Sequence, residues 1–210
     1  MIRILIADDH AIVRRGLKQI LTEIPGVAAI DEAANGQEVL AMVNKEDYDL
    51  VLLDISMPGR SGLDVLKQIR AEMPGVSVLM LSMHPEEQYA VRALKAGAAG
   101  YLTKESAPDE LIMAARKILA GGRYVSASLA ERLVYDLDRP SDKPPHETLS
   151  DREFQILRMI ASGKTVKEIG EDLALSVKTV CTYRARILAK MRLKNNAEIT
   201  RYAIENGLLQ

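Results

Sequence analysis

The chain has 210 residues, 48% hydrophobic and 27% charged, which suffices for one large or two small folded domains. A single Cys excludes an internal disulfide framework and a Cys-rich zinc site, and three scattered His residues show no metal-ligand spacing. The N-terminal run lacks the long apolar region of a signal peptide, and no later stretch approaches a membrane span. We therefore expect a cytoplasmic protein without a membrane partner.

The formal net charge of -1 conceals two halves of opposite sign. Residues 1–147 carry 17 Lys and Arg against 22 Asp and Glu, whereas residues 148–210 carry 11 against 7. Within 176–194 there are six basic residues and no acidic one. This distribution predicts a surface that faces a polyanion, provided that the basic side chains share one face.

The first 122 residues alternate between short apolar runs and segments with helical periodicity. The predicted strands are 2–7, 27–30, 50–53, 76–81 and 100–102. The predicted helices are 11–23, 37–44, 62–72, 86–96 and 108–120. Strict alternation of this kind predicts an α/β fold, a flavodoxin-like (βα)5 doubly wound parallel sheet with right-handed crossovers, over residues 1–122.

Residues 123–147 change character and are predicted to form a linker with a short helix. An amphipathic piece at 126–137 precedes a Pro-rich stretch at 138–146 that we interpret as exposed. From 148 to 210 there is no strand pattern, only four short helical segments. Two of them start with the capping-box patterns Ser150-x-x-Glu153 and Thr165-x-x-Glu168. A second, smaller all-α domain is therefore expected at 148–210.

Asp54 ends an apolar strand and is followed at once by the turn 56–59. Any short polar residue can cap such a strand, so this carboxylate is uninformative by itself. However, Asp8 and Asp9 follow the first predicted strand. In the strand order 2-1-3-4-5, strands 1 and 3 are neighbours, so the three carboxylates converge. Their mutual repulsion calls for a cation, and all-oxygen ligands suit Mg²⁺.

Two further polar residues follow the remaining strands of the predicted sheet. Ser82 ends the fourth strand and Lys104 follows the fifth, which would place a hydroxyl donor and a positive charge on the other side of Asp54. Together with a metal ion, these groups would neutralise a phosphoryl group during its transfer. Taken singly, each residue has an alternative, purely structural interpretation, since Lys104 could be a solvated loop charge and Ser82 a turn hydroxyl.

This set of strand-end residues, with Met57-Pro58-Gly59 and the run 98–101, resembles the CheY-like receiver domains of bacterial response regulators. The resemblance implies that Asp54 is the phosphoacceptor and takes its phosphoryl group from a phosphohistidine on a sensor histidine kinase. The resemblance also implies that Asp9, Asp54 and the backbone carbonyl of Ser56 bind Mg²⁺, with Asp8 acting through water. Ser82 and Lys104 would bind the phosphoryl oxygens. Ser82 and Tyr101 would act as the switch. Tyr101 could equally be an ordinary core aromatic.

Two predicted helices, 166–173 and 176–191, are joined by only two residues, which is a helix-turn-helix layout. On a helical wheel centred on Val180, Arg184, Ile187 and Met191 lie on the inner side and a small, basic face lies opposite. Such a face can enter the major groove of DNA. The alternative is a solvated face on a protein-interaction module. The candidate DNA-binding residues are Lys178, Thr179, Cys181, Thr182, Ala185 and Arg186.

The C-terminal motifs resemble the LuxR-type helix-turn-helix. They are Leu149-Ser-x-Arg152-Glu153, Gly163-Lys164, Lys167-Glu168-Ile169, Leu175 to Val180 and Ala197-Glu198. With the receiver, they make the chain similar to NarL/FixJ-type two-component response regulators, and 183–186 resembles the GacA-like members. The resemblance implies a transcription regulator, not an enzyme. It would bind double-stranded DNA as a homodimer on phosphorylation, with RNA polymerase as a further partner.

Three rival functions are weaker. A phosphorylation-dependent protein-binding switch would keep the receiver and lack a DNA output. A dehalogenase-type phosphatase expects a second Asp two residues after Asp54, where this chain has Ser56. A nucleotide-binding enzyme expects a Gly-rich loop after the first strand, and none follows it.

Overall fold

The computed structural model describes residues 1–83, 86–131 and 144–209. Its internal contacts divide the chain into two compact units, Met1–Asp138 and Arg139–Gln210. Across the described ranges, no helix is both long and apolar enough to cross a membrane.

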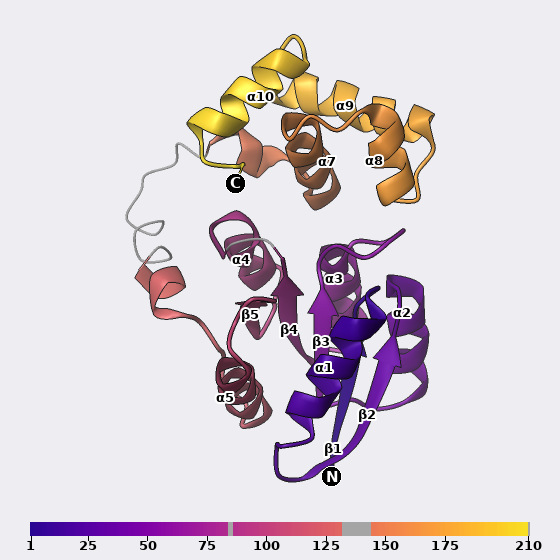
Figure 1. Cartoon of the computed structure of the whole chain (residues 1–210), viewed down its shortest axis with the longest axis vertical. Coiled ribbons are helices and arrows are strands. Elements are labelled where there is room, and N and C mark those ends of the chain that lie inside the picture. Colours follow the sequence, from indigo (N-terminus) through magenta and orange to yellow (C-terminus); the bar gives the residue numbers. More distant parts are fainter. Residues whose placement is uncertain (84–85, 132–143, 210) are drawn as a thin grey trace. The chain divides into compact units, whose positions relative to one another are not determined.

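The first unit is a parallel sheet of five strands in the order β2-β1-β3-β4-β5, with helices on both faces (Figure 1). The strands are β1 Ile2–Ala7, β2 Val27–Ala33, β3 Leu50–Asp54, β4 Ser77–Ser82 and β5 Gly100–Thr103. The helices are α1 Ala11–Leu21, α2 Gly36–Lys45, α3 Gly62–Glu72, α4 Glu86–Lys95 and α5 Pro108–Leu119. The predicted (βα)5 doubly wound fold is confirmed.

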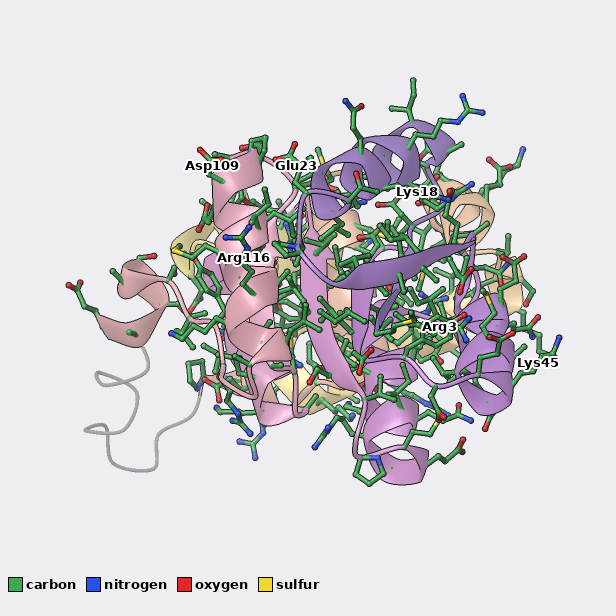
Figure 2. The ribbon with its side chains drawn as sticks, turned by 90° about the horizontal axis from the view of Figure 1, so that it is seen from below. Arg3, Lys18, Glu23, Lys45, Asp109 and Arg116 are labelled. Atoms are coloured by element: carbon green, nitrogen blue, oxygen red, sulfur yellow. The ribbon has the colours of Figure 1, made fainter. Side chains whose placement is uncertain are left out.

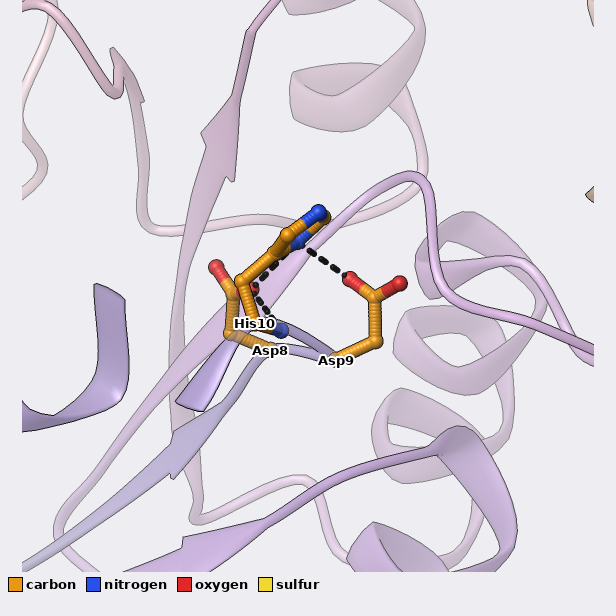
Figure 3. A group of neighbouring side chains, drawn as sticks. All are labelled: Asp8, Asp9 and His10. Atoms are coloured by element: carbon orange, nitrogen blue, oxygen red, sulfur yellow. Dashed lines mark hydrogen bonds and ion pairs between the residues drawn. The ribbon is translucent and has the colours of Figure 1, made fainter. Parts of the chain in front are cut away.

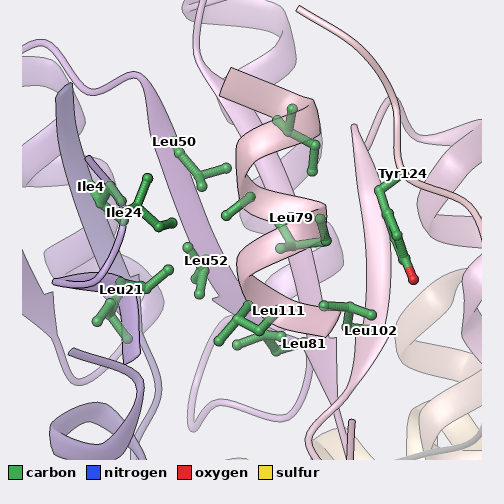
Figure 4. Packing of buried hydrophobic residues seen from close by; sticks show 14 residues of the cluster. Ile4, Leu21, Ile24, Leu50, Leu52, Leu79, Leu81, Leu102, Leu111 and Tyr124 are labelled. Atoms are coloured by element: carbon green, nitrogen blue, oxygen red, sulfur yellow. The ribbon is translucent and has the colours of Figure 1, made fainter. Parts of the chain in front are cut away.

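The core forms because successive side chains of each strand point to opposite faces of the sheet. Ile4 and Leu52 lie in the cluster that also contains Leu21 of α1 and Leu111 of α5 (Figure 4). All five residues of β3 are buried, which explains their continuous apolar run up to the terminal Asp54.

β2 extends three residues beyond its predicted end, and its additional residues include two acids. Asp31 pairs with the guanidinium of Arg3 at 3.1 Å, and Glu32 pairs with Arg14 of α1 at 3.1 Å. These ion pairs allow a polar sequence to continue an edge strand. Apolar patterning does not detect this kind of stabilisation, so the prediction stopped at residue 30.

α5 has charges that match its dipole. Pro108 occupies its first turn with Asp109 and Glu110, and Arg116 and Lys117 lie in its last turn. Figure 2 shows Asp109 and Arg116 along this helix. The sequence therefore specifies both the start and the direction of the helix that covers one face of β3 to β5.

After α5 the chain returns to the edge of the sheet. Tyr124 forms an isolated parallel bridge with Gly100, and its N–H donates to the carbonyl of Ala99 at 2.8 Å. Residues 127–131 are helical. The rest of the predicted amphipathic piece and the Pro-rich stretch up to residue 143 lie outside the described residues.

In the second unit, the described residues begin at 144, shortly before the predicted start of the helical domain at 148. The 3-10 helix η1 Pro145–Thr148 places His146 Nδ1 2.9 Å from the hydroxyl oxygen of Tyr202. His146 also packs beside Phe154, with ring centroids 6.0 Å apart. His146, in the predicted linker, therefore contacts two residues of the predicted helical domain.

Four helices follow, as predicted: α7 Asp151–Ala161, α8 Val166–Asp172, α9 Val177–Met191 and α10 Asn196–Glu205. Both predicted capping boxes are present, at Ser150 with Glu153 and at Thr165 with Glu168. The Ser176 hydroxyl caps α9 by accepting from the N–H of Thr179. The short connection between α8 and α9 gives the helix-turn-helix arrangement.

Candidate functional site

Two acidic side chains meet at the carboxyl ends of neighbouring strands. Asp54 is the last residue of β3, and Asp8 directly follows β1, which pairs with β3. Asp8 is 0% exposed and Asp54 is 1% exposed. Asp9 lies one residue further along and is exposed. The sheet order thus brings buried carboxylates together at the switch point, where doubly wound folds bind ligands.

Lys104 supplies a positive charge between these two carboxylates. Its Nζ lies 2.6 Å from Asp8 Oδ2 and 2.9 Å from Asp54 Oδ2, and its side chain is 7% exposed. The backbone N–H of Lys104 donates to the carbonyl of Ser82 at 2.7 Å, which fixes the lysine to the end of β4. Residues from three strand ends therefore form one charged cluster.

The charges of this cluster influence one another. Burial raises the pKa of Asp54, an effect that the positive charge of Lys104 offsets only in part and that nearby Asp8 reinforces. Burial lowers the pKa of Lys104, but the charges and hydrogen bonds of Asp54 and Asp8 outweigh it, so this pKa is raised. Lys104 therefore stays protonated beside the Asp54 carboxylate.

Ser82 and Tyr101 both lie inside the protein. Ser82 ends β4 and is 0% exposed; its register partner is Thr103 of β5. Tyr101 is also fully buried and pairs with Met80 of β4. Ser82 is thus one strand away from Asp54, while the Tyr101 ring occupies the core in this conformation.

Sequence reasoning missed Gly62, which follows the loop after Asp54 and is the first residue of α3. The N–H of Ser56 donates to Asp54 Oδ1 at 3.2 Å, and the N–H of Gly62 donates to the carbonyl of Ile55 at 2.9 Å. A Cβ on Gly62 would lie 2.0 Å from the backbone oxygen of Asp54. Gly62 therefore permits the first turn of α3 to pack against the strand end. A Gly at the start of a predicted helix was the available signal.

His10 and Arg14 were also missed, and both contact the acidic residues. Figure 3 shows His10 in contact with both acids; its Nδ1 lies 2.8 Å from Asp9 Oδ1 and 3.3 Å from Asp8 Oδ1. Arg14 donates to the backbone carbonyl of Asp8 at 2.7 Å. Ligand atoms of Asp8, Asp9 and His10 all lie within 4.8 Å of one another. This donor set, two carboxylates and one imidazole, fits a divalent cation.

The α9 helix divides into a buried and an exposed side. Val180, Ile187 and Met191 are buried, and Arg184, predicted on the inner side, is half-buried. The Nε of Arg184 donates a hydrogen bond to Asn196 Oδ1 at 2.5 Å.

The candidate DNA-binding residues lie mostly on the exposed side. Lys178, Cys181, Thr182, Ala185 and Arg186 are exposed. Thr179 differs from the other candidates. It is half-buried, and its hydroxyl lies 2.7 Å from that of the capping residue Ser176.

Comparison with family models identifies both units. Residues 4–116 match the response regulator receiver domain, and residues 147–203 match the bacterial regulatory proteins of the luxR family. The response regulator UvrY of Escherichia coli K12 is 38% identical over 209 residues, which cover 99% of this chain and 96% of UvrY. The response regulator GacA of Pseudomonas protegens is 38% identical over 209 residues, covering 100% of this chain and 98% of GacA.

Solved structures agree with this assignment. A complex of the two-component response regulator RcsB with DNA is similar at 27% identity and a TM-score of 0.60, over 96% of each chain. RcsB from Salmonella enterica serovar Typhimurium, bound to the rprA promoter with the phosphomimetic BeF3⁻, matches at 26% identity and a TM-score of 0.66, over 96% of this chain and 98% of that one. Such proteins are DNA-binding regulators and not enzymes. The chain belongs to the NarL/FixJ-type response regulators, which join a receiver to a LuxR-type DNA-binding domain.

Proposed function

We propose that Asp54 is the phosphoacceptor and that its phosphorylation controls the affinity of the C-terminal domain for DNA. The observation that carries this proposal is the position of Lys104, which lies within 3 Å of both buried carboxylates and is held by the end of β4. A buried carboxylate beside a fixed ammonium is suited to attack a phosphoryl group whose charge the ammonium then neutralises.

In the proposed reaction, an oxygen of Asp54 attacks the phosphorus of a phosphohistidine on a sensor histidine kinase. The P–N bond breaks and the histidine leaves as the neutral imidazole after protonation. Lys104 and Ser82 bind the phosphoryl oxygens in this proposal. Their places at neighbouring strand ends support these roles.

Mg²⁺ is the proposed cofactor of this step. Asp9, Asp54 and the carbonyl of Ser56 would hold it, and Asp8 would act through water. The ion would supply positive charge to the phosphoryl group and screen the carboxylates from one another. The burial of Asp8 and Asp54 supports this assignment, because two adjacent buried carboxylates exceed the charge that Lys104 can balance.

The proposed switch links Ser82 to Tyr101. A phosphoryl group on Asp54 adds roughly -1.5 to -2 charge and three acceptor oxygens, which would draw the Ser82 hydroxyl toward it. Tyr101 would then repack together with α4 and β5. Amide exchange over β5, with and without a phosphoryl mimic, tests this step, and unchanged exchange there would contradict it.

The output is proposed to be sequence-specific binding of double-stranded DNA by a phosphorylation-dependent homodimer that acts on transcription with RNA polymerase. Lys178 and Arg186, exposed on α9, would contact phosphates or base edges, with Thr179, Cys181, Thr182 and Ala185 beside them. A cytoplasmic location belongs to the same proposal. So do the domain limits 1–122 and 148–210, with 123–147 as the linker.

Genome-wide mapping of binding sites tests input and output together. Wild type is compared with Asp54→Ala and with Asp47→Ala, which removes an exposed carboxylate from the same unit. We expect wild type and Asp47→Ala to occupy the same sites and Asp54→Ala to lose most of them. Site occupancy that is identical in all three proteins would contradict control by Asp54. Absence of any DNA occupancy would instead favour a protein-binding switch.

A further inference from the structure

His10 brings a nitrogen donor to the acidic edge of the sheet. Its Nδ1 lies 2.8 Å from Asp9 Oδ1 and 3.3 Å from Asp8 Oδ1 (Figure 3). The His10 side chain is 66% exposed, so an ion from solvent can reach it, whereas Asp8 is fully buried. The proposed phosphoryl transfer assigns no role to this imidazole.

The spacing of these atoms is that of ligands around one metal ion. Metal–ligand bonds of about 2.1 Å place adjacent ligands of an octahedron roughly 3 Å apart. The two distances from His10 Nδ1 to the carboxylate oxygens lie on either side of this value. An ion could therefore replace the contacts between His10 and the acids with little movement of the side chains.

The neighbouring charges leave this side of Asp8 available to a cation. Lys104 approaches Asp8 through Oδ2, while His10 approaches through Oδ1. Asp8 Oδ1 also accepts a hydrogen bond from the backbone N–H of His10 at 2.8 Å, which fixes the carboxylate relative to the imidazole. The lysine and a metal ion would thus occupy opposite sides of one carboxylate.

We propose that His10 is a direct metal ligand in this receiver, together with Asp9, while Asp8 acts through water as in the proposed Mg²⁺ site. This inference rests on the proposed metal site and adds to it a nitrogen ligand. Imidazole favours transition ions such as Ni²⁺ and Zn²⁺, whereas Mg²⁺ prefers oxygen ligands and keeps several waters. His10 therefore gives the site a preference for imidazole-binding divalent ions that compete with Mg²⁺. On binding, the proton that Nδ1 donates to the carboxylates passes to solvent, Nε2 carries the remaining ring proton, and the Nδ1 lone pair binds the ion.

Calorimetric titration of the full chain with Ni²⁺ and, separately, with Mg²⁺ tests the proposal. We expect His10→Ala to weaken Ni²⁺ binding by about tenfold or more, the loss typical of removing a ligand or its support. We expect its Mg²⁺ affinity to change less than about twofold, because oxygen ligands dominate Mg²⁺ binding. His10 is largely exposed, so the variant should retain the fold, which circular dichroism checks.

Three control variants test whether the loss of Ni²⁺ binding is specific to His10 and whether the metal site itself is correct. The chain has two other histidines, and we expect His84→Ala and His146→Ala to bind Ni²⁺ like wild type. Asp9→Asn should weaken the binding of both ions. Unchanged Ni²⁺ affinity in His10→Ala, or an equal loss for both ions, would overturn the role of His10 while leaving the Mg²⁺ site intact. Unchanged Mg²⁺ affinity in Asp9→Asn would overturn the proposed metal site itself.

Discussion

The acidic pocket of the receiver and the exposed face of α9 both carry charges for which we propose a function, yet they are built in opposite ways. In the pocket, the charged groups are buried and their partners come from distant parts of the sequence, as with Lys104 and Asp54, 50 residues apart. On α9, the side chains are exposed and their contacts are local, as with Thr182, whose hydroxyl donates to the carbonyl of Lys178.

Because of this difference, stability and function should be coupled in the pocket and independent of each other on the exposed face of α9. A change in the pocket alters buried charges that the fold must accommodate, so it should affect stability and chemistry together. A change on the exposed face of α9 removes little packing, so it should affect binding alone. Substitutions in the two regions test this contrast, and they are taken in order from the largest expected effect to the smallest.

Lys104→Met should have the largest effect on stability. It leaves Asp8 and Asp54 buried without their cation, and removing one partner of a buried ion pair costs about 3–5 kcal/mol. Urea unfolding at neutral pH without divalent ions measures the loss. Lys117→Met, an exposed substitution on α5, is the matched control and should change stability by less than about 0.5 kcal/mol.

The same variant has a characteristic pH dependence. Burial raises the pKa of Asp54 and Lys104 opposes this, so the pKa should rise further in Lys104→Met. A carboxyl group with a higher pKa in the folded state destabilises that state as pH rises from the ordinary Asp range through the raised pKa. The deficit of Lys104→Met should therefore shrink on acidification through that range. An equal deficit at every pH would contradict the buried-charge explanation.

Gly62→Ala should destabilise the receiver by about 1–3 kcal/mol, the usual cost of overpacking. The added Cβ would collide with the backbone of Asp54, so this proposed phosphoacceptor must also shift. Gly75→Ala is the control, because its Cβ would meet nothing within 4 Å. Denaturant unfolding measures stability, and phosphorylation by a small acyl phosphate measures the effect on Asp54. Similar behaviour of the two variants would show that the close approach is unimportant.

Arg186→Ala should weaken DNA binding without changing stability. If the guanidinium contacts a phosphate, the plot of log affinity against log salt should become less steep, with the magnitude of its negative slope smaller by about one. Arg201→Ala removes another exposed charge, from α10 of the same domain, and should leave that slope unchanged. Fluorescence anisotropy with labelled DNA at several salt concentrations measures both. A loss of thermal stability in Arg186→Ala would break the proposed contrast between the regions.

Lys190→Met should cost only about 1 kcal/mol, since Lys190 is partly exposed. It removes the 2.6 Å contact to buried Glu153. Burial raises the pKa of Glu153, but hydrogen bonds from Lys190 and Ser150 outweigh it and the pKa is lowered.

A lowered carboxyl pKa stabilises the fold above the ordinary Glu range, and this contribution is lost as pH falls through the lowered value. Thermal unfolding should therefore show a difference between wild type and Lys190→Met that decreases in acid. Lys167→Met, which breaks only an exposed pair with Glu171, is the control. A persistent difference at low pH would mean that packing, not charge, explains the effect.

The contrast also explains what the sequence could predict. Strand-end position was enough to bring Asp8 and Asp54 together once the alternation of strands and helices had indicated a doubly wound fold, in whose order 2-1-3-4-5 strands 1 and 3 are neighbours. Local capping patterns were likewise enough for the starts of α7 and α8. Both kinds of prediction depend on short-range patterns or on connectivity.

Close contacts between distant segments were not predictable in this way. The approach of Gly62 to the Asp54 carbonyl depends on the path of a loop, and the contact of His10 with the acids depends on a side-chain rotamer. The extension of β2 depends on ion pairs made by Asp31 and Glu32. The anchoring of His146 by Tyr202 joins residues 56 positions apart.

The most direct test of the account compares DNA affinity with and without beryllofluoride, a phosphoryl mimic, at one salt concentration. In the full-length protein with Mg²⁺, we expect the mimic to tighten binding by about tenfold, within the usual range of coupling between two sites. Asp54→Ala should show no response and should bind like the untreated wild type. Equal affinity of treated and untreated wild type, or a full response in Asp54→Ala, would contradict the claim that Asp54 controls the DNA-binding domain.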